Sequence, residues 1–102
     1  MLFHVTMTHS PDNCPVNLPP DELKKFFAEA EKMLDAAKQR NIDIKFMVAG
    51  VGHTMYALME ADSFIALNSF LGGMPFKQDL QAEPVGYAKD IISAFKEELA
   101  KQ

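Results

Sequence analysis

The sequence predicts an α+β domain of the ferredoxin-like type, with the element order βαββαβ followed by a C-terminal helix. Four short segments alternate apolar and polar residues, as strands with one covered face do. Residues 17–41 and 86–102 repeat apolar residues at helical spacing, and a short apolar segment, 63–71, separates two of the strands. Neither repeats nor low-complexity linkers interrupt the chain. Its 102 residues are therefore expected to form a single ferredoxin-like domain, 1–102.

Three strand segments show the alternation most clearly, because each divides into two sets of side chains. The first sets are Phe3, Val5 and Met7 in residues 2–9; Ile42, Ile44, Phe46 and Val48 in 42–50; and Met55, Ala57 and Met59 in 53–61. The opposite sets are His4, Thr6 and Thr8; Asp43, Lys45 and Met47; and Thr54, Tyr56, Leu58 and Glu60. A fourth strand is expected at residues 76–85, with Pro84 at its end or at a sheet edge.

The helices carry recognisable boundary signals. Prolines and acidic residues open the first helix, Asn41 is expected to end it in a left-handed conformation, and Asp62 or Ser63 is expected to cap the short helix before Gly72. The apolar stripe of the first helix predicts core packing by Leu23, Phe26, Phe27, Ala30, Met33, Leu34 and Ala37. The terminal helix offers two inward sets, Tyr87, Ile91, Phe95 and Leu99 or Ala88, Ile92 and Leu99.

Composition excludes several classes of protein. The net charge is −4 and no basic cluster occurs, which argues against a nucleic-acid partner. No apolar run approaches the length of a membrane helix, and residues 1–10 lack a basic start, so neither a membrane partner nor a signal peptide is expected. A single cysteine cannot form an internal disulfide. We therefore expect a cytoplasmic protein.

The second face of the predicted sheet is the main structural question. Its apolar and weakly polar members, Thr6, Met47, Tyr56 and Leu58, are accompanied by the polar side chains His4, Lys45 and Glu60. Such a face is too apolar for water and too polar for a sealed core. Pairing with the sheet of a second copy would bury it and enclose a cavity, so a homodimer is expected, with larger homo-oligomers left open.

Several stretches of the sequence resemble those of two known families. The start MLFHVTM resembles the N-terminal strand of the muconolactone isomerase family, and YALMEADS (56–63) and DLQAEPV (79–85) extend this similarity. The start MLFHVTMTHSPDNCP is closer to that of a family of short bacterial proteins of unknown function. The resemblance implies membership of the dimeric α+β barrel superfamily, whose sheets pair face to face. It also implies a small-molecule pocket and an isomerase-like enzyme that needs no cofactor.

The isomerase family moves a double bond within a lactone by taking and returning a proton. His4 is the polar residue of the matching start that suits such chemistry, because imidazole titrates near neutral pH. Tyr56 would orient the substrate, and Thr6, Met47, Leu58 and Glu60 would line the ligand pocket. Asp79 is a further carboxylate candidate. The alternative for His4 is a hydrogen-bonded histidine in a dimer interface.

The segment HSPDNCP, residues 9–15, supports a different hypothesis. Neighbouring first and third strands would bring its loop toward His53, so that His9, Cys14 and His53 could bind a transition metal such as zinc, copper or iron. Turn formation by Ser10 to Asn13 and burial of Cys14 explain the same residues without a metal. The sequence therefore leaves three functions open: a small-molecule enzyme without cofactor, a non-catalytic binding or assembly module, and a metal-binding protein.

Overall fold

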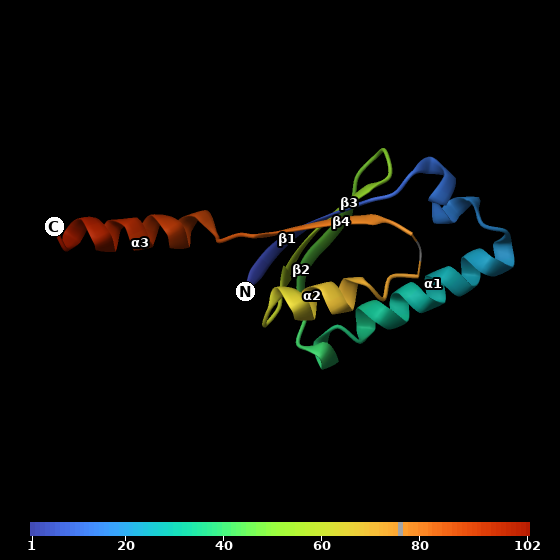
Figure 1. The fold of residues 1–102 in the computed structure, drawn as a ribbon, viewed down its shortest axis with the longest axis horizontal. Helices are drawn as coiled ribbons and strands as arrows, with labels where there is room; N and C mark the ends of the chain where they lie inside the picture. Colours follow the sequence, from blue (N-terminus) through green and yellow to red (C-terminus); the bar gives the residue numbers. More distant parts are fainter. Residues whose placement is uncertain (76) are drawn as a thin grey trace.

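The computed structural model describes residues 1–75 and 77–102, and Figure 1 shows their arrangement. The α+β fold predicted from the sequence is confirmed: an antiparallel sheet has helices α1 and α2 on one side, and a third helix follows. The elements are β1 (Leu2–Thr8), α1 (Pro20–Asp35), β2 (Asp43–Ala49), β3 (Thr54–Glu60), α2 (Phe64–Leu71), β4 (Asp79–Pro84) and α3 (Ala88–Ala100). Phe76, with which the expected fourth strand began, lies outside the described residues.

The four strands lie in the order β2-β3-β1-β4, and every pairing is antiparallel. The central strand β1 places Thr6 opposite Tyr56 of β3 and opposite Gln81 of β4. Directly paired residues point to the same face of a sheet. The register therefore defines two faces, one covered by α1 and α2 and one left open, which we call the open face.

The core lies between the sheet and the two helices. In β1 the residues Phe3, Val5 and Met7 are at most 1% exposed, as the alternation predicts, and they pair with Met59, Ala57 and Met55. The helix α2 contributes the buried side chains Leu67, Phe70 and Leu71. The Ser63 hydroxyl caps this helix by accepting a hydrogen bond from the Ala66 amide at 3.1 Å, which confirms the second of the two expected caps.

The face prediction for β2 is wrong in its second half. The register shifts between Ile44 and Phe46, where a bulge inserts an extra residue. Phe46 then pairs with Leu58 on the open face, while Met47 pairs with the buried Ala57 on the covered face. A one-residue shift moves every later side chain to the other face. Met47 therefore does not share a face with Thr6, Tyr56 and Leu58 as expected.

Helix α1 covers the sheet only loosely, contrary to the core packing expected for its apolar stripe. No residue of α1 is buried, and Phe27 is 50% exposed. Ala37, after the helix has ended, is buried in the core at 3% exposure, and Met33 of α1 is partly buried against the core. Asn41 has the predicted left-handed backbone, with φ 58°, but it ends a short 3-10 helix, Lys38–Arg40. The expectation that it ends the first helix is wrong, because α1 already ends at Asp35.

Helix α3 projects away from the sheet, and the chain measures 64 × 30 × 18 Å along its principal axes (Figure 1). Every residue from Glu83 to Gln102 is exposed. Neither expected inward set of this helix packs against its own chain. No described helix is long and apolar enough to cross a membrane.

Candidate functional site

The segment HSPDNCP folds into a compact loop after β1. Two short 3-10 helices, Pro11–Asn13 and Pro15–Asn17, follow each other, and Cys14 lies between them. The Cys14 amide donates to the Pro11 carbonyl at 3.2 Å, and the Asn17 side-chain amide donates to the same carbonyl at 2.8 Å. The loop therefore turns back on itself, with turn chemistry as the sequence predicts.

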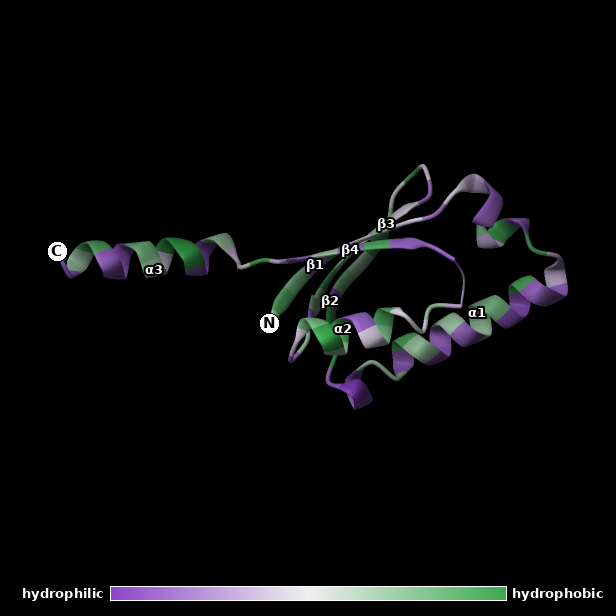
Figure 2. Cartoon of the chain, viewed as in Figure 1, coloured by the Kyte–Doolittle hydropathy of each residue, from purple (hydrophilic) through white to green (hydrophobic). Residues whose placement is uncertain are grey.

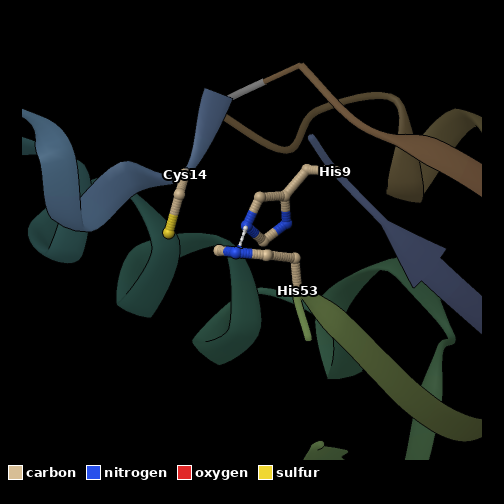
Figure 3. Close-up of side chains that lie close together, drawn as sticks. All are labelled: His9, Cys14 and His53. Carbon is tan, nitrogen blue, oxygen red and sulfur yellow. Dashed lines mark hydrogen bonds between the residues drawn. The ribbon is translucent and has the colours of Figure 1, made fainter. Parts of the chain in front are cut away.

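This loop meets the connection between β2 and β3 (Figure 3). The His9 amide donates to the His53 carbonyl at 3.2 Å. The side chains also approach, with His53 Nδ1 3.3 Å from His9 Nε2. One potential ligand atom from each of His9, Cys14 and His53 lies within 4.8 Å of the other two. The proximity expected from the order of strands is thus observed, and we call these three residues the His–Cys–His cluster.

The electrostatics of the cluster favour a neutral imidazole at His9. Burial lowers the pKa of His9 below its usual value, and the nearby His53 lowers it further. The two rings meet edge to face, with centroids 5.0 Å apart. A neutral imidazole carries a lone pair that can accept a proton or bind a metal.

A pocket of about 530 Å³ lies beside this cluster, between α1 and the covered face of the sheet. His9 and Cys14 contribute to its lining, together with Pro15 and Val16. The remaining lining is almost entirely apolar and comprises Phe26, Phe27, Ala30, Leu34, Met47, Ala49, Gly50, Thr54, Met55 and Met74. A volume of this size suits a small organic molecule.

The pocket residues of α1 were not predicted as site residues. Phe26, Phe27, Ala30 and Leu34 belong to the stripe that was expected to fill the core. Periodicity shows which side of a helix is apolar, but it does not show how far the helix lies from the sheet. Met47 was predicted to line a pocket on the open face; it lies on the covered face and lines this different pocket instead.

The other predicted site residues lie on the open face. His4 and Tyr56 have ring centroids 6.1 Å apart, and His4 is flanked by Leu58 and Glu83. Thr6 lies opposite Tyr56. These residues are therefore neighbours, but they lie across the sheet from the pocket and the His–Cys–His cluster.

The two carboxylate candidates lie at opposite ends of the open face. Glu60 pairs with Leu2, and its Oε1 is 3.6 Å from the N-terminal ammonium group, with both groups about half exposed. Asp79 pairs with Thr8 at the other end of β1 and is exposed. Neither carboxylate lies directly opposite His4 on a neighbouring strand. The residue of β4 that pairs with His4 is Glu83.

These observations define a class: an antiparallel α+β sandwich with one sheet face covered and one open. The sequence matches no family model and is similar to no curated protein. Its structure is similar to that of muconolactone isomerase, with a TM-score of 0.61 and 20% identity over 83% of this chain and 88% of that chain. It is also similar to a protein of Streptomyces coelicolor A3(2), with a TM-score of 0.53 and 17% identity over 84% and 98%. The chain thus has the muconolactone isomerase-like fold.

Proposed function

We propose that this protein binds a small, largely apolar molecule in the pocket between α1 and the sheet. The observation that carries the proposal is an almost wholly apolar pocket of about 530 Å³, whose lining includes His9 and Cys14. An apolar wall supplies affinity, and a few polar groups in the lining can orient a ligand. The fold shared with muconolactone isomerase, an enzyme named for a small lactone, agrees with such a role.

The exposure of the pocket wall supports a ligand rather than simple core packing. Phe27 and Leu34 are 50% and 36% exposed although they face an apolar hollow. Large apolar side chains in an unfilled hollow leave area that a ligand can remove from water. Each buried CH₂ group of such a ligand would contribute about 0.8 kcal/mol to binding.

Filling the pocket is expected to abolish this binding. In Ala30→Phe, the new ring enters the pocket and should weaken binding of the apolar fluorescent probe anilinonaphthalene sulfonate by roughly tenfold or more. Ala28→Phe is the matched control, because Ala28 is exposed and lies beside charged residues of the same helix. Fluorescence titration of metal-free protein measures both. Equal affinities of Ala30→Phe and Ala28→Phe would place the probe elsewhere.

We further propose that the protein is a homodimer, and helix α3 supports this. Ile91, Ile92, Phe95 and Leu99 are 47–69% exposed and form an apolar stripe along the helix (Figure 2). A helix of 13 residues is marginal in water without packing. Every residue of α3 is exposed in the part of the chain that the structure describes, and a second copy is the partner that we propose for the stripe.

The open face offers a matching surface for the second copy. Phe46, Val48 and Tyr56 are 43%, 51% and 39% exposed there. Covering these side chains and the α3 stripe together would remove two unpartnered apolar surfaces from water. In this arrangement His4 and Tyr56 would lie inside the chamber between two copies.

Proton transfer at His4 is a second candidate function, favoured by its neighbours. The Tyr56 ring lies 6.1 Å away, and Glu83 is paired beside His4 on the same face. Taking and returning a proton requires a base, and a nearby hydroxyl donor can orient the substrate.

This candidate is tested with muconolactone, the substrate class named by the structural neighbour. Wild-type protein in heavy water should incorporate deuterium into the lactone, and His4→Gln should reduce that rate by roughly 10²-fold or more. Thr8→Val, on the same strand face, is expected to retain the rate. Absence of exchange in the wild type would count against isomerase-like chemistry on this lactone and would leave pocket binding unaffected.

A further inference from the structure

We propose that His9, Cys14 and His53 form a binding site for a divalent transition-metal ion such as Zn²⁺, beside the pocket. Two imidazoles and one thiolate are a donor set that zinc and its borderline-soft neighbours prefer. Metal binding goes beyond the proposed pocket function and does not depend on it.

The spacing of the cluster fits a shared ion. A tetrahedral zinc centre with Zn–N bonds of about 2.0–2.1 Å holds two nitrogens about 3.3 Å apart. His53 Nδ1 and His9 Nε2 are 3.3 Å apart in this chain. A thiolate in the same centre would lie about 3.6 Å from each nitrogen. The sulfur of Cys14 is within 4.8 Å, so a small side-chain adjustment completes the set.

The backbone holds the three donors in position before any ion binds. A hydrogen bond of 3.2 Å from the His9 amide to the His53 carbonyl joins the end of β1 to the β2–β3 connection. The paired 3-10 helices return Cys14 to the same place (Figure 3). The donors come from three segments that are fixed by their own hydrogen bonds, so little ordering remains to oppose binding.

The backbone conformation of His53 allows a substitution that removes a metal ligand without disturbing the fold. His53 has φ 65° and follows Gly52 at φ 82°, so it occupies the left-handed region that glycine adopts without strain. Replacing His53 with glycine therefore removes a donor while the turn conformation stays accessible. A loss of metal affinity in this variant cannot be attributed to a distorted turn.

The cluster offers three protein ligands, which leaves a fourth position on a tetrahedral ion for water or a ligand. His9 and Cys14 also line the pocket, so this part of the inference rests on the proposed pocket function. The molecule that fits both features has an apolar body and a metal-binding head, such as a carboxylate, hydroxamate or thiol. The lining of the pocket sets the size and polarity of the body.

The metal site is tested on the reduced full-length chain after removal of metals by chelation. Competition with a chromogenic chelator should give one Zn²⁺ per chain. Co²⁺ should give an intense near-ultraviolet sulfur-to-metal band together with visible bands of tetrahedral geometry. Cys14→Ser should remove the sulfur band, and both Cys14→Ser and His53→Gly should weaken Zn²⁺ binding by roughly 100-fold or more, since even outer-sphere changes cost 10- to 100-fold.

Asp12→Asn is the matched control, because Asp12 is an exposed carboxylate in the same loop that the cluster does not use. Its affinity for Zn²⁺ should stay within about threefold of wild type, as expected for a surface substitution outside the site. Zn²⁺ binding that survives both Cys14→Ser and His53→Gly, or that is absent in the wild type, overturns the metal site.

Binding of a ligand to the open coordination position is tested separately. Phenylacetohydroxamate should bind the Zn²⁺-loaded chain at least about tenfold more tightly than the metal-free chain, and Ala30→Phe should remove this preference. Equal binding to both forms would overturn the link between metal and pocket. Failure of anilinonaphthalene sulfonate to bind metal-free protein would instead count against the pocket function, while the Zn²⁺ titration still decides the metal site.

Discussion

Phe70→Ala is expected to lower the free energy of unfolding by about 3–5 kcal/mol. The Phe70 side chain is 0% exposed in the core between α2 and the sheet. Its ring also lies 5.6 Å from the Arg40 guanidinium, so truncation removes this contact as well as creating a cavity. Small domains have about 5–15 kcal/mol of stability in total, so the variant should be close to unfolding at physiological temperature.

Urea unfolding followed by circular dichroism measures this loss, at one protein concentration because dimerisation would contribute to stability. Phe27→Ala is the matched control, since the same atoms are removed from a side chain that is 50% exposed. Phe27→Ala should lower the free energy of unfolding by less than about 1.5 kcal/mol, which is at most half of the loss expected for a fully buried ring. Equal losses at the two positions would mean that α1 packs closely on the sheet in solution.

The double variant Ile91→Gln/Phe95→Gln is expected to convert the proposed dimer into a monomer. The two side chains are 47% and 67% exposed on a helix that touches little of its own chain. If each contributes about 2 kcal/mol as a buried interface residue, the dissociation constant should rise by roughly three orders of magnitude. Light scattering on a size-exclusion column measures the mass, and far-ultraviolet circular dichroism should show the loss of the α3 helix.

Lys89→Gln/Lys96→Gln is the control for this variant, because it changes two polar residues of the same helix and leaves the apolar stripe intact. It should retain the mass of wild type. A wild-type chain that is a stable monomer at micromolar concentration would contradict the dimer outright. A dimeric double variant would show that the open face pairs without help from α3.

The proximity of some site residues could be predicted from the sequence, because it follows from the order of the strands. Antiparallel β1 and β3 bring the loop after β1 to the connection before β3, so His9 and His53 had to approach. Cys14 follows by only five positions and returns through proline-set turns. The distance between their nitrogens, and the left-handed backbone of His53, were not readable from residue types alone.

The pocket could not be predicted from the sequence. It depends on the distance between α1 and the sheet and on the extra residue that the bulge inserts into β2. The bulge at β2 turned Met47 toward α1, where it lines the pocket with Met55. No pattern of apolar residues marks where a strand gains an unpaired residue, since alternation continues on either side of it. The apolar stripe of α1 could likewise be recognised in the sequence, but the distance between α1 and the sheet could not.

By itself the sequence determined the βαββαβ order, the buried set of β1, the helix cap at Ser63, the left-handed backbone of Asn41, and a sheet with one unshielded face. These features arise from local spacing and local hydrogen bonds, which neighbouring residues set. Only the tertiary structure decided that α1 stands off the sheet, that α3 leaves its own chain, and that Met47 faces the pocket. Those outcomes depend on contacts between distant segments, whose shape no local pattern contains.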